Sequence, residues 1–302
     1  MNIRAALQLT ALLVTPFAVA LAFPVAPAYA AAAVCQGQPA TIEGAGTTVT
    51  GTDGNDVIVA THPYVNLNAM GGNDLICVGG GIVLTGAGDD SVVSTAPAKG
   101  FTEANLEGGN DSYVNLGKGA SRVYAVGVTG LHVDLGPGGG DVWLLSTSTP
   151  GTGSVDFGPN EGRLFAMGAS EAHVDLEHQK AGVDNLLNIK VANVYDATAS
   201  GAVVRMTGNA WKNVLAASGC DVLIDGGEGR DVLSKVGGGL DRSSSDCPKR
   251  KFRSVLKGGL GPDRLSGRGT DDVLLGGPGR DVAQGKGGKD RCVAEVESNC
   301  ER

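Results

Sequence analysis

The stretch GGLGPDRLSGRGTDDVLLGGPGRDVAQGKGGKDRCV, residues 258–293, consists of four consecutive nine-residue repeats. Each repeat begins with glycine and carries an aspartate at its sixth position. An ordinary globular core does not need an aspartate at this regular interval beside a glycine-rich turn, whereas metal sites stacked along a coil do. The repeats begin at Gly258, Gly267, Gly276 and Gly285, and their aspartates are Asp263, Asp272, Asp281 and Asp290.

Further copies of the repeat occur outside this run. Residues 226–234 (GGEGRDVLS) supply Asp231, and two copies near the N-terminus, GTDGNDVIV and AMGGNDLIC, supply Asp56 and Asp74. The block between those two, ATHPYVNLN, has Val65 at the sixth position. Ordinary Gly-Asp turn chemistry explains the weaker copies equally well; these end at Asp90, Asp111 and Asp141.

The repeat follows the pattern GGxGxDxUx, where U is a large apolar residue, and resembles the RTX family of hemolysin-type calcium-binding repeats. The resemblance implies that each turn offers backbone carbonyls and its aspartate a carboxylate, while a short strand with U inward follows. Calcium takes about six to eight oxygen ligands, and glycine lets the backbone approach the ion closely. The implied calcium-binding residues are Asp56, Asp74, Asp231, Asp263, Asp272, Asp281 and Asp290, with the turn glycines Gly258, Gly259, Gly261, Gly267, Gly269, Gly276, Gly277, Gly279, Gly285 and Gly287.

In the family, two repeats form one coil and each ion bridges two turns on the same side. Asp263 and Asp281, Asp272 and Asp290, and Asp56 and Asp74 are accordingly each eighteen residues apart. The side of the coil that carries Val65 is expected to lack an ion. The U positions nevertheless stay in phase through the N-terminal run, at Val49, Ile58, Leu67 and Ile76.

We therefore expect an all-β protein, a right-handed parallel β-solenoid of the β-roll or β-helix type with degenerate central coils. Glycine accounts for 49 of 302 residues and aromatic residues for 4%, which fits a narrow stacked ladder better than a globular core. The expected regions are a signal peptide (1–30), N-terminal RTX-like coils (31–115), degenerate coils (116–219) and C-terminal repeats (220–302). The last region contains an insertion (235–257), pinned by a disulfide, and a C-terminal cap.

The central region repeats the motif Val-Asp-(Leu/Phe), with Val133, Val155 and Val174 predicted to face inward. The aspartates Asp134, Asp156 and Asp175 would then form an outward column. A solvated strand face explains this column, and carbohydrate binding or acid–base chemistry is the alternative. His173 and His178 flank Asp175, but no nucleophile or metalloprotease motif accompanies them. Residues 202–216 fit a further coil poorly, and a short helix is the alternative there.

The N-terminus has the features of a secretion signal, with Arg4, an apolar stretch and a small-residue cleavage site at Ala28–Ala30. No later segment has the length and hydropathy of a membrane span. A net charge of −8 makes nucleic acid an improbable partner. We therefore expect a secreted, extracellular protein.

Six cysteines in an oxidising compartment allow fifteen disulfide pairings. The N-terminal and C-terminal cysteine-containing segments resemble those of secreted actinobacterial RTX-repeat proteins, which carry cysteines at the same places. With this resemblance we favour the pairs Cys35–Cys77, Cys220–Cys247 and Cys292–Cys300.

The insertion carries a basic run, Lys249, Arg250, Lys251 and Arg253. Such a run is either a solvated loop or a contact for an anionic surface polymer. The function expected from the whole sequence is non-enzymatic calcium binding that folds and stabilises an extracellular solenoid, with a cell-surface or matrix role. The main alternative is a polysaccharide-active β-helix enzyme of the lyase or epimerase type, for which Trp143 and Trp211 are the only tryptophans available. A detached repeat tail of a larger toxin or protease is a weaker alternative, because a signal of this kind precedes the repeats.

Overall fold

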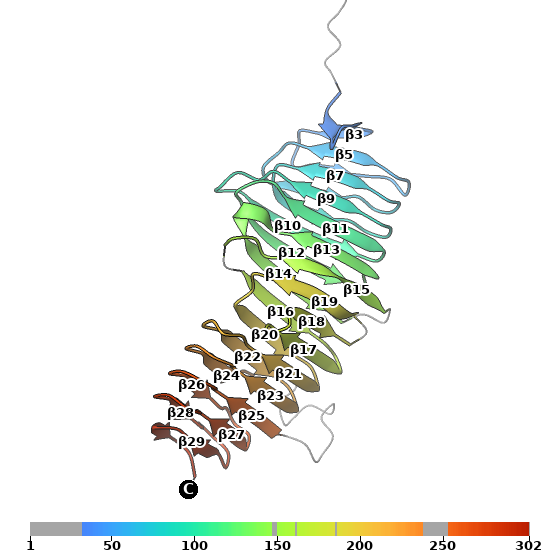
Figure 1. Ribbon diagram of the computed structural model, residues 1–302. Coiled ribbons are helices and arrows are strands. Elements are labelled where there is room, and N and C mark those ends of the chain that lie inside the picture. The colour runs from blue at the N-terminus through green and yellow to red at the C-terminus, as the bar shows by residue number, and fades with distance from the viewer. Residues whose placement is uncertain (1–31, 147–149, 161, 185, 238–252, 302) are drawn as a thin grey trace, which may run out of the picture. The chain divides into compact units, whose positions relative to one another are not determined.

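The computed structural model describes residues 32–301 except 147–149, 161, 185 and 238–252. Contacts divide the chain into Met1–Ala32 and Ala33–Arg302, and every element below belongs to the second unit. Its strands alternate between two large sheets, so neighbouring strands of one sheet come from successive coils (Figure 1). The predicted all-β parallel solenoid is confirmed. The predicted signal peptide lies outside the described residues.

Sheet 1, the smaller of the two, contains thirteen strands that pair in parallel. In spatial order they are β4 (Thr48–Thr50), β6 (Val65–Asn68), β8 (Gly81–Leu84), β10 (Phe101–Glu107), β12 (Ala120–Val126), β14 (Gly140–Leu145), β16 (Arg163–Met167), β20 (Asp196–Ser200), β22 (Val214–Ser218), β24 (Val232–Lys235), β26 (Arg264–Ser266), β28 (Val282–Gln284) and β30 (Val296–Ser298).

Sheet 2 contains fifteen strands, and a two-stranded ribbon of β1 (Val34–Cys35) and β2 (Gln38–Pro39) precedes it. In spatial order the strands of sheet 2 are β3 (Ile42–Gly44), β5 (Val57–Ala60), β7 (Leu75–Val78), β9 (Ser91–Ser94), β11 (Asn110–Asn115), β13 (Gly130–Asp134), β15 (Gly151–Asp156), β19 (Leu186–Ala192), β18 (Lys180–Val183), β17 (Glu171–Asp175), β21 (Val203–Thr207), β23 (Asp221–Asp225), β25 (Arg253–Lys257), β27 (Asp272–Leu275) and β29 (Arg291–Val293).

The core is a pair of apolar ladders, one from each sheet. Side chains alternate along a strand, so the inward residues of successive strands stack on one another. The predicted U residues Val49 and Leu67 pair in sheet 1, Ile58 and Ile76 pair in sheet 2, and all four are buried. The ladder of sheet 1 runs through Val49, Leu67, Val83, Ala104, Val123, Val142, Leu164, Ala197, Leu215, Leu233, Leu265 and Ala283.

Sheet 2 is interrupted by an antiparallel excursion that the sequence analysis missed. Strand β18 pairs antiparallel with both β17 and β19, and β19 then pairs in parallel with β15. Val133 stacks on Val155 as predicted, but Val174 lies against Ala181 and Met206. The third Val-Asp copy is therefore displaced from the other two by the two extra strands.

Asp184 holds this excursion in place. Its carboxylate accepts hydrogen bonds from the amides of Ala169, Ser170 and Glu171 and from the Ser146 hydroxyl. Burial alone would raise the pKa of Asp184, but these donors lower it below the usual range.

The helix considered for residues 202–216 is wrong. These residues form strand β21, a turn and most of strand β22, with Val204, Met206 and Leu215 buried in the two ladders. The only helical element within the described ranges is the three-residue η1 (Gly136–Gly138). No helix in this part of the chain has the length and hydropathy of a membrane span.

Two of the predicted disulfides are present. Cys35–Cys77 joins the N-terminal ribbon to strand β7, and Cys292–Cys300 closes the C-terminal end, with Cα–Cα distances of 5.6 and 5.8 Å. The proposed Cys220–Cys247 pair lies outside the described residues at Cys247. Strand β25 continues the regular coils, because Leu256 lies between Ile224 and Leu274 in the ladder. The insertion is therefore shorter than the predicted 235–257.

Glycine is required where successive turns touch. A Cβ atom at Gly261 would lie 1.7 Å from the Gly229 carbonyl oxygen of the preceding coil, and its φ is +120°. At Gly269, by contrast, a Cβ atom would have no neighbour within 4 Å. The repeat array thus contains glycines with very different constraints.

We predict that Gly261→Ala lowers the free energy of unfolding by more than about 1–3 kcal/mol, since a strained φ adds to a steric clash. Gly269→Ala, the matched control, should change stability little. Chemical denaturation of both variants in the same calcium concentration measures the difference. Equal losses would contradict the close stacking of these turns.

Candidate functional site

The N-terminal copies of the repeat form one column of buried aspartates, here called the N-terminal column. Each member precedes or begins a strand of sheet 2. The backbone amide of every member except the last donates a hydrogen bond to the Oδ1 atom of the aspartate in the next coil, at 2.8, 2.8 and 3.1 Å. The members are Asp56, Asp74, Asp90 and Asp111.

Two more columns occupy the C-terminal coils and use the same hydrogen bond. Column C1 lies at the turns that lead into sheet 1, and column C2 lies at the turns that lead into sheet 2. The amide-to-carboxylate distances are 2.8 to 2.9 Å wherever aspartate follows aspartate. Column C1 contains Asn213, Asp231, Asp263, Asp281 and Glu295, and column C2 contains Asp272, Asp290 and Glu301.

All seven predicted calcium-binding aspartates therefore belong to columns, and the predicted same-side pairs are brought together. The structure adds Asp90 and Asp111, which ordinary turn chemistry explained equally well in the sequence. It also adds Glu295 and Glu301, which receive the last amide of columns C1 and C2. Neither glutamate lies in a repeat, so the nine-residue pattern gave no signal for them.

In most column carboxylates only one of the two oxygens has a hydrogen-bond partner. Asp263 and Asp281 are 1% and 0% exposed, yet in each the Oδ1 atom accepts an amide and the Oδ2 atom has no hydrogen-bond partner in the structure. A buried charged oxygen without a partner is costly. The carboxylates that share this state are Asp74, Asp90, Asp111, Asp231, Asp263, Asp281 and Asp290.

The first residue of each column is satisfied differently. Asp56 Oδ2 accepts the Thr52 amide, and Asp272 Oδ2 accepts the Arg268 amide, both at 2.8 Å. Column C1 begins instead with the neutral Asn213, whose Oδ1 accepts the Asn209 amide. The seven predicted aspartates are thus not equivalent, because Asp56 and Asp272 are already hydrogen-bonded through both oxygens.

The electrostatics follow this difference. Burial, together with the smaller effect of neighbouring carboxylates, raises the pKa of Asp74 to about 6, that of Asp231 to about 7 and that of Asp111 to about 8. Burial also raises the pKa of Asp90, Asp263 and Asp290. In Asp56, hydrogen bonds from Thr52 and Thr41 outweigh burial, and the pKa falls below its usual value.

A buried cation lies beside the first residue of column C2. Lys235, at the end of strand β24, is 4% exposed, and its Nζ atom donates to Thr270 Oγ1 at 2.5 Å. The same atom lies 3.7 Å from Asp272 Oδ1. In the preceding coil, Ser254 pairs with Asp272 and occupies the position where the repeat would place an aspartate. Lys235 thus supplies positive charge at the end of the column where the repeat is broken.

The turn glycines fit an oxygen-ligand site. A Cβ atom at Gly258 would lie 2.4 Å from Asp263 Oδ2, and one at Gly276 would lie 2.4 Å from Asp281 Oδ2. Gly267 and Gly285 have the same relation to Asp272 and Asp290, so the first glycine of each repeat leaves space beside the carboxylate. A Cβ atom at Gly259, Gly261, Gly277 or Gly279 would clash with a carbonyl of the preceding coil, whereas a Cβ atom at Gly269 or Gly287 would have no neighbour closer than 3.6 Å.

Among the described residues, no three His, Cys, Asp or Glu side chains cluster as a metal site would require if side chains alone supplied it. A cation in these turns would therefore depend on backbone carbonyls as well as the aspartates. Calcium accepts such mixed oxygen sets.

The aspartates outside the columns have other partners. Asp141 forms an ion pair with Arg163, with Oδ2–Nη2 at 2.6 Å. Asp134 and Asp156 are neighbours in sheet 2, but Asp175 is separated from them by strands β18 and β19, so the predicted column of three is wrong. Asp134 and Asp156 accept amides of their own turns, and Asp175 binds His178 Nδ1 at 2.9 Å. Burial lowers the pKa of His173.

No family model matched the chain, and no curated protein sequence matched it.

We predict that Lys235→Met lowers the free energy of unfolding by about 3–5 kcal/mol, because it leaves a buried charge without its partner. Lys257→Met is the control, since the exposed pair of Lys257 and Asp225, 3.6 Å apart, should contribute at most about 1 kcal/mol. Denaturation curves in calcium compare the two variants. Similar losses would show that Lys235 is not an internal counter-charge.

We also predict that the calcium-free protein, prepared with a chelator, becomes less stable as the pH rises. The raised pKa values mean that the folded chain binds protons that the unfolded chain, with aspartate pKa near 4, has released. The stabilisation is complete below the unfolded pKa and is lost as the pH rises through the folded values of about 6 to 8. The melting temperature should therefore fall between about pH 5 and pH 8, and a rise over that interval would contradict the charge state assigned to the columns.

Proposed function

We propose that this chain is an extracellular, non-enzymatic calcium-binding protein of the RTX type, in which calcium folds and stabilises the solenoid. The observation that supports this best is the set of seven buried carboxylates whose Oδ2 atoms have no hydrogen-bond partner. They recur in successive coils beside glycine turns. A hydrophobic ladder alone does not explain why buried negative charge is repeated in this way.

Calcium would be held by column aspartates together with carbonyl oxygens of the glycine turns. When bound, it would supply positive charge and ligand bonds to the unpartnered carboxylate oxygens. The chain's own contribution is the amide that fixes Oδ1 of each aspartate. Because Asp74, Asp231, Asp263, Asp281 and Asp290 keep an unpartnered oxygen, we assign them the larger share of the binding, and we include Asp90 and Asp111 as further ligands.

The extracellular assignment is also a proposal. The two disulfides are typical of oxidising compartments, and the N-terminal sequence has the features of a secretion signal. Extracellular calcium modules bind at about 10⁻⁴ to 10⁻³ M. A chain with weak sites of this kind would remain loosely folded where calcium is scarce and become stable after export.

A contact between the basic run of the insertion and an anionic surface polymer stays a prediction. Lys249, Arg250 and Lys251 lie outside the described residues, and Arg253 begins strand β25. The enzyme alternative has less support than the calcium proposal, because the carboxylates of Asp134, Asp156 and Asp175 do not converge on one point of the sheet and are engaged by their own turns.

We predict that Asp281→Asn reduces calcium binding more than Asp141→Asn does. Asparagine keeps the Oδ1 acceptor for the Asp263 amide but removes the buried charge, so the calcium-free variant should also be more stable than the calcium-free parent. Asp141→Asn only weakens an ion pair on the outer face of sheet 1.

Titration calorimetry with calcium, and then with magnesium, measures binding, and far-UV circular dichroism follows folding. Millimolar calcium should increase the β signal of the parent, and magnesium should not replace it, because Mg²⁺ requires a stricter octahedral geometry. An unchanged spectrum in calcium, or equal losses of affinity in the two variants, would contradict the proposed function.

A further inference from the structure

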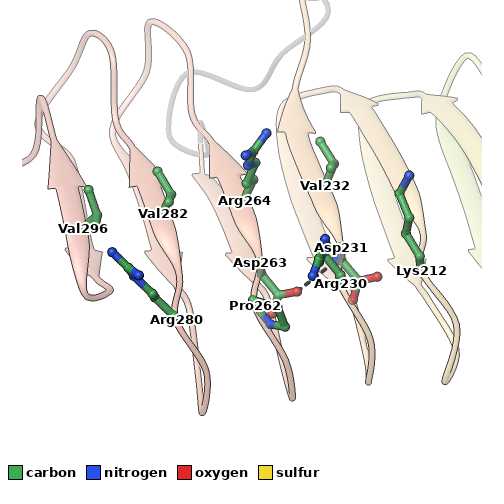
Figure 2. Close-up of a pocket in the computed structure, with 10 residues that line it drawn as sticks. All are labelled: Lys212, Arg230, Asp231, Val232, Pro262, Asp263, Arg264, Arg280, Val282 and Val296. Atoms are coloured by element: carbon green, nitrogen blue, oxygen red, sulfur yellow. Dashed lines mark hydrogen bonds between the residues drawn. The ribbon is translucent and has the colours of Figure 1, made fainter.

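The outer surface above column C1 carries one cation on each of four successive coils. Lys212, Arg230, Arg264 and Arg280 line one depression together with Val232, Val282 and Val296. Figure 2 shows Arg230, Pro262 and Arg280 in a row near the turns, with Val232, Arg264, Val282 and Val296 in a second row across the strands. We call this depression the basic groove.

These four cations have exposed side chains. None of them has a side-chain hydrogen bond or an ion pair among the described residues, although other arginines such as Arg122, Arg163 and Arg205 do. Asp231 and Asp263 also line the depression, but they are only 0% and 1% exposed. A chain with a net charge of −8 thus presents four exposed cations around one depression.

The basic groove continues into an aromatic surface. Lys212 also lines a second depression with Trp211 and Tyr195, and these two aromatic residues line a third with Gln179, Asn193 and Asn209. Trp211 is 67% exposed and Tyr195 is 36% exposed. Three adjoining depressions therefore place exposed rings and amide side chains at one end and cations at the other.

We propose that this surface binds a linear acidic polysaccharide that carries about one charged group per sugar. Adjacent strands of a sheet are about 4.8 Å apart, so four successive coils present cations at intervals comparable to the length of a sugar residue. Flat aromatic rings stack on the apolar face of a sugar ring, and amides bind hydroxyl groups. The three depressions thus match the three kinds of group on such a glycan.

The surface fits other polyanions less well. Single-stranded nucleic acid needs aromatic rings distributed along the groove for base stacking, whereas here both rings lie at one end. None of the groove residues belongs to the basic run of the insertion. The inference does not rest on calcium binding, because none of the four cations is a proposed calcium ligand. Arg264 lies in strand β26, and Lys212, Arg230 and Arg280 are exposed turn residues that precede column C1 residues.

The test uses the full-length disulfide-bonded protein at one fixed calcium concentration and a chondroitin sulfate decasaccharide as the probe. We expect Arg230→Gln/Arg280→Gln to weaken binding about tenfold at low salt, because two charge contacts are lost. The control Lys289→Gln/Arg291→Gln removes the same charge at column C2 and should change affinity less than about twofold. Circular dichroism and calcium titration of each variant separate loss of the site from loss of the fold.

Two further arms test the aromatic end and the class of ligand. Trp211→Ala should weaken binding at both low and high salt, whereas the arginine effect should diminish as salt screens the charges. A desulfated, carboxyl-reduced decasaccharide should bind weakly to every form. Equal losses in the two double variants, no effect of Trp211→Ala, or equal affinity for an oligonucleotide of the same charge would each overturn the proposal.

Discussion

The N-terminal and C-terminal coils depend on a hydrogen bond that joins one coil to the next at the turn: an aspartate amide donates to the Oδ1 atom of the aspartate one coil further on. This bond fixes the register of the turns, while the apolar ladders fix the register of the strands. It also buries a carboxylate in every coil that it joins. Because the second oxygen of most of these carboxylates has no partner, the bond that orders the turns creates a repeated electrostatic cost.

The ends of the columns show how the chain limits that cost without an ion. Thr52 and Thr41 satisfy Asp56, a neutral asparagine begins column C1, and Lys235 lies beside Asp272. Glu295 and Glu301 accept the last amides at the C-terminus. Unpartnered oxygens remain on the interior members and on Asp111, the last residue of the N-terminal column, and these are the positions at which we place calcium.

Sequence spacing predicted the parts of the structure that depend on strict repetition. Val49, Ile58, Leu67 and Ile76 are buried as expected, and the eighteen-residue aspartate pairs are in contact. The sequence could not assign Asp90 and Asp111 to the column, because the column reaches them through intervals of 16 and 21 residues, which break the nine-residue phase. Lys235 finds its partner 35 residues away, and the β17–β19 excursion reverses strand direction, so neither leaves a periodic signal. Residues such as Lys235 can be identified only from the three-dimensional arrangement of the coils.

The most direct test of the calcium columns is a crystal structure of the protein grown with calcium, with anomalous diffraction data to identify the ions. Our account predicts ions in contact with Oδ2 atoms of interior column residues, Asp263 and Asp281 above all, and none at Asp134, Asp141 or Asp156. Ions found only on the outer face, or columns without any ion in saturating calcium, would contradict it.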